Sequence, residues 1–301
     1  FPCQDFSVAG KRKGFNSMRT HDGKLRADDL PTEETRGKLY YWMKEVIDIT
    51  KPKIFIAENV KGLVNMGQVK DIIQADFSQA DGNGYIVLSP QVLHAGNYGV
   101  PESRERVIFI GIRKDALKEE IAQILKNDLI PNHLNPYPQP THNCTLNDET
   151  LATPVVLCDV LKQLKEPKES FDPSQRFYSK AKYMGAHCQG QKEITMNSIG
   201  PTIRSEHHGN IEYRRLSLEH GGTNKNELEK GLAERRLTPR ECALIQTFPP
   251  DFQFVIPKDY DWKRFIVSAS GAYKVIGNAV PPILAYHIAM RIQNLWSTYF
   301  K

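Results

Sequence analysis

Four short stretches of the sequence carry polar side chains that packing alone does not require. They contain Cys3, Glu58, the pair Arg104 and Arg106, and Asn278. A thiolate, a carboxylic acid and two arginines can together attack an electron-poor aromatic ring. The thiolate adds to the ring, the acid protonates it or hydrogen-bonds to it, and the arginines hold a carbonyl oxygen. Covalent chemistry on such a ring is therefore the first hypothesis.

Each of these residues also has an ordinary structural interpretation. A lone cysteine such as Cys3 is usually a small buried hydrophobe, and Glu58 could be one half of an ion pair at a strand end. Arg104 and Arg106 fit the exposed edge of a strand, and Asn278 beside a glycine is typical of a turn. The chemical hypothesis therefore depends on the elements that position these residues.

The stretches lie beside predicted strands and helices. A polar surface loop is expected over 11–29. After it, apolar spacing predicts helices over 33–50, 69–80 and 116–125, and strands over 53–57, 85–94 and 106–112. The β-branched apolar run over 53–57 is of the kind found in a strand buried on both faces. The alternation predicts an α/β sheet with functional residues at the strand ends.

This alternation stops near residue 126, which predicts more than one domain. A helix is expected to begin with Thr238 as its N-cap and Pro239 at its first position, and the chain is expected to close on an amphipathic helix over 281–299. The predicted order is the C-terminal part of a catalytic α/β domain over 1–126, a Pro- and Asn-rich linker over 127–150, a smaller domain over 151–235 and a return to the first domain over 236–301.

Composition narrows the class of protein. The 301 residues are 40% hydrophobic and 25% charged, which is ordinary for a globular protein. The sequence contains no apolar run of about 18 residues, so it predicts no membrane-spanning helix. The five cysteines are odd in number and form no C-x-x-C pair, so they fit neither a disulfide framework nor a structural zinc site and indicate a reducing compartment. A net charge of +5 permits a polyanionic partner without identifying one.

Taken in order, the motifs resemble those of the DNA cytosine-5 methyltransferase family. That family carries a Pro-Cys nucleophile motif, Glu-Asn-Val, Gln-x-Arg-x-Arg, an Arg-x-x-x-Pro-Arg-Glu helix start and a terminal Gly-Asn-(Ser/Ala)-Val. The corresponding stretches here are Pro2-Cys3-Gln4, Glu58-Asn59-Val60, Glu102-Ser103-Arg104-Glu105-Arg106, Arg236-Leu237-Thr238-Pro239-Arg240-Glu241 and Gly277-Asn278-Ala279-Val280. The resemblance covers nearly the whole chain. It implies a Rossmann-like sheet of the S-adenosylmethionine-dependent methyltransferases and a smaller, irregular target-recognition domain.

The resemblance also implies catalytic roles. Cys3 would add to carbon 6 of a flipped cytosine, which makes carbon 5 nucleophilic toward the methyl group of S-adenosylmethionine. Glu58 would contact ring nitrogen 3 and the exocyclic amine, and Asn59 would order the strand end. Arg106 would hold the base carbonyl, with Arg104 supporting it or a neighbouring phosphate. Reaching the ring requires base flipping, which costs a few kcal/mol.

Binding residues are implied in the same way. Pro2, Asn278 and Ala279 would line the site of S-adenosylmethionine. A stretch over 200–210, followed by 213–215, is the best candidate for target recognition in double-stranded DNA, because arginines, histidines and asparagine among glycines suit base and phosphate contacts. The DNA-binding residues implied are Gln4, Ser7, Thr202, Ile203, Arg204 and Arg240.

Two departures from the family pattern affect these expectations. Glu102 stands where the family has glutamine, so a hydrogen-bond donor role at that position is in doubt. The glycine-rich loop and the acidic residues that the family places before Pro-Cys for the cofactor are also missing. The chain is therefore expected to be a fragment, or an enzyme completed by an N-terminal fragment or subunit, or an inactive binding remnant.

A bacterial, cytoplasmic methyltransferase of a restriction-modification system is the preferred interpretation. An RNA cytosine-5 methyltransferase and a non-catalytic DNA-binding subunit remain the alternatives. Because Cys3 and Glu58 are both present, a catalytic protein is favoured over a non-catalytic DNA-binding subunit.

Overall fold

The computed structural model describes residues 38–301 except 83, 128, 189, 206–210 and 261, and these divide into two compact units. The first unit comprises the described residues up to Leu93, Glu105–Gln139 and Ile288–Lys301. The second comprises His94–Arg104 and Pro140–His287, so it takes in residues 236–287, which were expected to return to the first domain. None of the described helices is long and apolar enough to cross a membrane.

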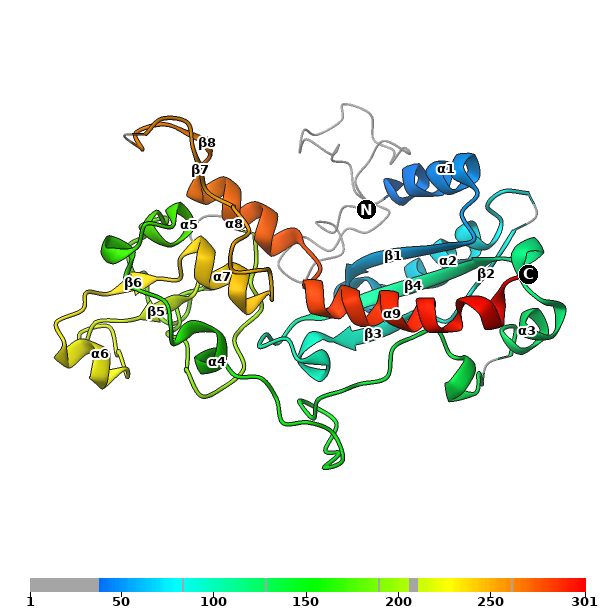
Figure 1. Ribbon diagram of the computed structural model, residues 1–301, viewed down its shortest axis with the longest axis horizontal. Coiled ribbons are helices and arrows are strands. Elements are labelled where there is room, and N and C mark those ends of the chain that lie inside the picture. Colours follow the sequence, from blue (N-terminus) through cyan, green and yellow to red (C-terminus); the bar gives the residue numbers. More distant parts are fainter. Residues whose placement is uncertain (1–37, 83, 128, 189, 206–210, 261) are drawn as a thin grey trace. The chain divides into compact units, whose positions relative to one another are not determined.

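A small sheet forms the centre of the first unit (Figure 1). The long strand β4 (Glu105–Arg113) lies between β1 (Ile54–Val60) and β2 (Tyr85–Val87) and pairs antiparallel with both. Strand β3 (Gln91–His94) also pairs with β4. The helices whose residues lie wholly or mainly in this unit are α1 (Tyr40–Thr50), α2 (Val69–Ser78), α3 (Glu119–Ile124) and α9 (Pro282–Tyr299).

Three sequence expectations about these elements need correction. The strand expected over 85–94 is two strands, because the segment between them contains Pro90, which has no N–H to donate to a ladder. Burial of the early strand on both faces is wrong: Phe55 and Ala57 are buried, whereas Ile56 on the other face is 40% exposed. The helix expected over 116–125 is shorter, Glu119–Ile124.

The core of the first unit is aromatic. Phe55 makes edge-to-face contacts with Phe77 and Tyr85 at ring-centroid distances of 5.2 Å each, and Phe77 packs edge-on against Phe109 at 6.3 Å. This geometry places the positive edge of one ring against the negative face of another. The cluster fixes β1 against β4 and therefore fixes the positions of the side chains that follow along both strands.

The second unit is built from short elements. Its helices are α4 (Leu157–Leu161), α5 (Pro173–Arg176), α6 (Lys225–Glu229), α7 (Pro239–Ile245) and α8 (Ala269–Asn278), and its strands are β5 (Tyr213–Arg215), β6 (Arg235–Arg236), β7 (Ile256–Pro257) and β8 (Phe265–Val267). Strand β5 pairs with β6, and β7 pairs with β8. A separate apolar cluster that includes Leu237, Tyr273 and Ile276 forms its core.

The start of α7 confirms the predicted helix cap. The hydroxyl of Thr238 accepts a hydrogen bond from the Glu241 N–H at 3.0 Å, and the Glu241 carboxylate accepts one from the Thr238 N–H at 2.9 Å. Pro239 occupies the first turn. This reciprocal capping box satisfies two N–H groups that have no partner within the helix, which explains why the local sequence was sufficient to predict this boundary.

We expect Gly111→Ala to destabilise the first unit. Gly111 lies opposite Phe55 in the β1–β4 ladder, and a Cβ there would approach the Phe55 ring to 2.1 Å. Crowding of this kind costs about 1–3 kcal/mol. Urea unfolding followed by circular dichroism measures the loss.

Gly271→Ala in α8 is the matched control, because a Cβ there meets nothing nearer than Val267 at 3.4 Å. Within a helix this change should be neutral or stabilising by up to about 1 kcal/mol. Equal unfolding midpoints for the two variants would contradict the packing described here.

Candidate functional site

The end of β1 and the start of β4 bring together a carboxylate and an arginine. In the antiparallel register Glu58 lies opposite Ile108 and Val60 opposite Arg106, so Glu58 and Arg106 are diagonal neighbours on one face of the sheet. Arg106 Nε lies 2.7 Å from Glu58 Oε1, and the two side chains are 13% and 27% exposed. The structure therefore assembles two of the expected catalytic residues into one partly accessible pair.

Asn59 lies on the opposite face of β1 and is buried. Its side-chain oxygen accepts a hydrogen bond from the Val60 N–H at 2.9 Å, immediately before the 3-10 turn Lys61–Asn65. This bond shapes the chain where the strand ends. An ordering role at the strand end, as expected for Asn59, is consistent with this geometry.

Arg104 is completely buried and lies in the second unit. Its Nη1 donates to the carbonyl of Ile203 at 2.8 Å, and its Nη2 donates to the carbonyls of Gly277 at 2.9 Å and Ala279 at 2.7 Å. A guanidinium enclosed in this way does not reach a phosphate. Of the two roles expected for Arg104, the phosphate contact does not fit this enclosure, and support of the base carbonyl stays a prediction.

The glutamate that departs from the family pattern lies beside this arginine. Glu102 is buried, and its Oε1 accepts from the Ile203 N–H at 2.6 Å and lies 3.5 Å from Arg104 Nη1. A carboxylate supplies the negative charge that a buried arginine needs. Glu102 therefore acts as a hydrogen-bond acceptor here. Its charge beside the buried Arg104 gives a local physical explanation for glutamate in place of the family's glutamine.

The expected cofactor residues Asn278 and Ala279 end helix α8. Asn278 is exposed, and Ala279 is the C-cap whose N–H bonds to the Ile276 carbonyl at 3.2 Å. Because Arg104 holds the carbonyl of Ala279, this turn is fixed while the Asn278 amide stays accessible. The described residues thus fit a polar ligand at this turn. Pro2, the third expected cofactor residue, lies outside the described residues.

The expected DNA-binding residues fall into three groups. Gln4 and Ser7, like the expected nucleophile Cys3, lie outside the described residues. The side chains of Ile203 and Arg240 are only 3% and 4% exposed, and Arg240 Nε is paired with Asp172 at 2.6 Å. Burial leaves these two unable to contact DNA through their side chains in this structure.

Thr202 and Arg204 form the third group and are more accessible. The hydroxyl of Thr202 donates to the Ser103 carbonyl, and Arg204 Nη2 lies 2.7 Å from Glu212 Oε1. The Arg204 side chain is 26% exposed. Of the six residues, these two are the described ones placed to meet a ligand.

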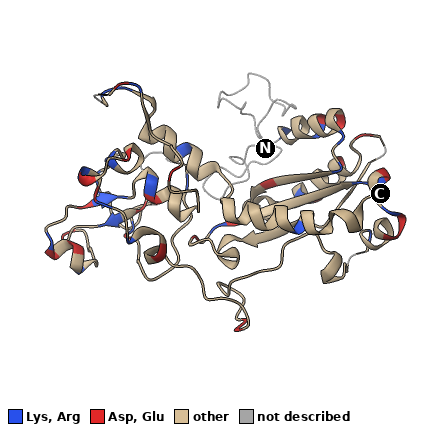
Figure 2. Ribbon diagram, in the orientation of Figure 1, with Lys and Arg blue, Asp and Glu red and all other residues tan. Residues whose placement is uncertain are grey.

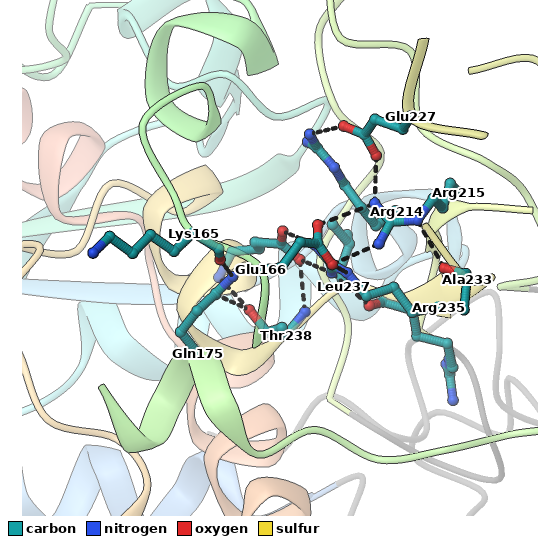
Figure 3. A network of polar contacts seen from close by, with 12 residues as sticks. Lys165, Glu166, Gln175, Arg214, Arg215, Glu227, Ala233, Arg235, Leu237 and Thr238 are labelled. Atoms are coloured by element: carbon teal, nitrogen blue, oxygen red, sulfur yellow. Dashed lines mark hydrogen bonds and ion pairs between the residues drawn. The ribbon is translucent and has the colours of Figure 1, made fainter. Parts of the chain in front are cut away.

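A network of buried arginines and partly or fully buried glutamates in the second unit was not predicted from the sequence (Figure 3). Glu166 accepts from Arg215 Nη2 at 2.6 Å and from Arg235 Nε at 3.0 Å. Arg235 also binds Glu241 at 2.8 Å, and Arg215 binds Glu227 at 2.5 Å. Glu166 is about 50 and 70 residues from its two partners in the sequence, so no local spacing could have revealed the pairing.

The charges in this network shift the pKa values of its acids. Burial alone would raise the pKa of Glu166, but hydrogen bonds from Arg215 and Arg235 overcome it and lower the pKa to about 2. Burial would likewise raise the pKa of Glu241, and the ion pair with Arg235 lowers it instead. Both carboxylates are therefore ionised partners of the arginines near neutral pH.

Arg104→Met should destabilise the second unit by about 3–5 kcal/mol, because it leaves the Glu102 charge buried and unpairs three main-chain carbonyls. Arg264→Met is the matched control. Its guanidinium is 70% exposed and pairs only with Asp259 among the described residues, so it should cost under about 1 kcal/mol. Similar losses in urea unfolding for both variants would show that the Arg104 contacts are not important to stability.

Glu166 should make the unfolding free energy of the second unit depend on pH in the acidic range. Its folded pKa of about 2 is below the ordinary value of 4.5, so its contribution is complete above about pH 4.5 and is lost as the pH falls toward 2. Between pH 6 and 3.5, the wild type should lose about 1 kcal/mol more unfolding free energy than Glu166→Gln. Glu229→Gln, which removes an exposed carboxylate on α6, should behave like the wild type, and parallel pH profiles for all three proteins would contradict this assignment.

Comparison with known proteins places these features in context. The family model described as C-5 cytosine-specific DNA methylase matches residues 1–294. The chain is 30% identical to the Type II methyltransferase M.FnuDI of Fusobacterium nucleatum, over 97% of this chain and 74% of that protein. It is 30% identical to M.HpaII of Haemophilus parainfluenzae over 95% and 68%, and 32% identical to M.BspRI of Lysinibacillus sphaericus over 100% and 61%. It thus spans between 61% and 74% of these relatives.

A solved structure supports the fold. A DNA modification methyltransferase from an Escherichia coli prophage matches with a TM-score of 0.51 and 20% identity, over 86% of this chain and 74% of that one. At this identity the likeness establishes the α/β methyltransferase fold alone. The expectation of a separate N-terminal chain receives no support from these comparisons.

Proposed function

The chain belongs to the C-5 cytosine-specific DNA methylase family, and we propose that it methylates carbon 5 of cytosine in a specific sequence of double-stranded DNA. The Glu58–Arg106 pair carries this proposal among the described residues. The two side chains come from separate motifs that lie 48 positions apart, and their polar atoms approach to 2.7 Å. An ordinary surface ion pair would account for the contact itself. It would not account for the fact that both partners belong to motifs of the family.

The pair is suited to one edge of a cytosine. The ring carries its carbonyl oxygen next to nitrogen 3, so an arginine and a carboxylic acid side by side can address both atoms. In our proposal Arg106 donates to the carbonyl oxygen and Glu58, in its protonated form, donates to nitrogen 3. Because Arg106 Nε already lies 2.7 Å from Glu58, the base must replace or share this contact.

Cys3 is the proposed nucleophile. Its sulfur forms a bond to carbon 6, and the electrons of the 5,6 double bond move to carbon 5, which Glu58 assists by protonating nitrogen 3. S-adenosylmethionine, when bound, supplies the methyl group. Release then requires loss of the carbon 5 hydrogen as a proton and cleavage of the sulfur–carbon bond. A cytosine within a duplex must leave the stack before Cys3 can reach it.

The remaining residues support these steps. Pro2, Asn278 and Ala279 are the proposed cofactor contacts, with Arg104 as a positioning residue that fixes the turn at Ala279. Asn59 orders the end of β1 beside Glu58. The similarity to Type II methyltransferases leads us to propose a role in a restriction-modification system and a location in the bacterial cytoplasm.

Duplex DNA containing 5-fluorocytosine tests the mechanism, because fluorine cannot leave carbon 5 as a cation and the adduct is therefore retained. The protein expressed from its complete reading frame should form an adduct stable in a denaturing gel when S-adenosylmethionine is present. Cys3→Ser should abolish the adduct. Glu58→Gln should slow its formation by about 10²–10⁴-fold.

Controls separate the alternatives. Glu105→Gln, which removes the neighbouring half-exposed carboxylate paired with Lys61, should leave the rate within about twofold, in keeping with the small effect of a surface ion pair. Sequence-specific DNA binding without an adduct would instead support a non-catalytic subunit. An adduct with RNA but not with duplex DNA would contradict the proposed substrate.

A further inference from the structure

The turn between α8 and α9 contains Asn278 and Ala279, the proposed cofactor contacts. Residues 275–290 include no Lys, Arg, Asp or Glu, and Figure 2 accordingly shows the end of α8 and the start of α9 without charged residues. This stretch therefore has no permanently charged side chain with which to anchor itself. Its position depends on hydrogen bonds, several of which come from other segments of the second unit.

The end of α7 supplies two of these hydrogen bonds from adjacent residues. The side-chain amide of Gln246, which is fully buried, donates to the carbonyl of Ile276 near the end of α8. The hydroxyl of Thr247 accepts from the N–H of Ile283 at 3.2 Å, at the second residue of α9. Gln246 and Thr247 thus hold both sides of the turn that carries the proposed cofactor contacts.

The N–H of Ile283 is the first one that α9 has to satisfy. The two residues before it, Pro281 and Pro282, have no N–H group. Proline also has no side-chain oxygen that could cap the helix from the preceding position. The hydroxyl of Thr247 therefore takes the place of a local N-cap, although it lies 36 positions away in the sequence.

Thr247 adopts a backbone conformation that threonine disfavours. Helix α7 ends in a Schellman motif, in which the Phe248 N–H bonds to the Ala243 carbonyl at 2.9 Å. The Thr247 N–H bonds to the Leu244 carbonyl, also at 2.9 Å. The motif requires a left-handed residue, and Thr247 has a φ of 67°. Glycine is usual at this position and a β-branched residue is an outlier, but glycine has no hydroxyl with which to hold Ile283.

We propose that Thr247 is a positioning residue for S-adenosylmethionine, whose hydroxyl holds the turn that carries Asn278 and Ala279. The inference rests on the proposed function, because it assigns a residue outside the family motifs to the cofactor site of the same enzyme. Arg104 holds this turn at the carbonyl of Ala279, and Thr247 adds a contact at the start of α9. Strained backbone conformations persist where the surrounding structure determines them, and they cluster at functional sites.

Calorimetric titration with S-adenosylhomocysteine, using the protein expressed from its complete reading frame, tests this role. Thr247→Gly should raise the dissociation constant by about 2- to 10-fold, the range for one neutral hydrogen bond. The relieved backbone strain offsets the lost hydrogen bond, so the unfolding temperature should change by less than about 3 °C. The KM for S-adenosylmethionine should rise by a similar factor, while kcat stays within about twofold.

Two further variants serve as controls. Thr247→Ser keeps the hydroxyl and should bind S-adenosylhomocysteine within about twofold of the wild type. Asn147→Gly places glycine at another left-handed position of the second unit, where the exposed Asn147 has a φ of 54°. Because Asn147 lies outside the turn, this variant should leave the dissociation constant unchanged.

The outcomes separate this inference from the proposed function. An unchanged dissociation constant in Thr247→Gly, or an equal loss of affinity in Thr247→Ser, would overturn the inference. A large fall in the unfolding temperature of Thr247→Gly would show an ordinary structural role and would overturn it as well. In each case, wild-type protein that forms the 5-fluorocytosine adduct keeps the proposed function intact. Wild-type protein that binds no S-adenosylhomocysteine would contradict the proposed function and the inference together.

Discussion

The second unit depends on pairing arginine charges that are removed from water. Arg215 and Arg235 are almost fully buried, and each is bound by two carboxylates. An unpaired charge in such a place would cost several kcal/mol. The arrangement takes the place of a larger regular framework, because strands β5 and β6 are only three and two residues long. Side-chain hydrogen bonds therefore hold segments that main-chain ladders are too short to hold.

Arg104 extends the same principle to the candidate site. Its contacts join the turn after α8 to the main chain at Ile203, and Glu102 balances its charge. The end of the helix that carries the proposed cofactor residues and the expected recognition stretch at Ile203 thus share one buried arginine. Any change to this residue would affect both at once, which is why we regard Arg104 as a positioning residue.

The arginine proposed for chemistry and the one expected in recognition are held in different ways. Arg106 is paired with Glu58 on the face of a sheet whose aromatic core fixes the strand positions. Arg204 instead stands on main chain held by buried side chains, with a single carboxylate directing its fork. In both cases a carboxylate orients the guanidinium. The buried Arg240, in contrast, is directed to Asp172 and is 4% exposed.

The sequence by itself determined the family, the α/β class and the features that depend on neighbouring residues. The capping box at Thr238 is an example, because its two partners are three positions apart. The Glu58 and Arg106 motifs were also identified from the sequence, although their 2.7 Å contact depends on the register of β1 and β4. The tertiary structure alone decided which polar residues are buried. Arg240 belongs to a motif that was recognised in the sequence, but its side chain is buried and paired with Asp172. Glu166 meets its arginine partners across 49 and 69 positions. Local propensities carry no information about such pairings, because burial of a charge is decided by the whole fold around it.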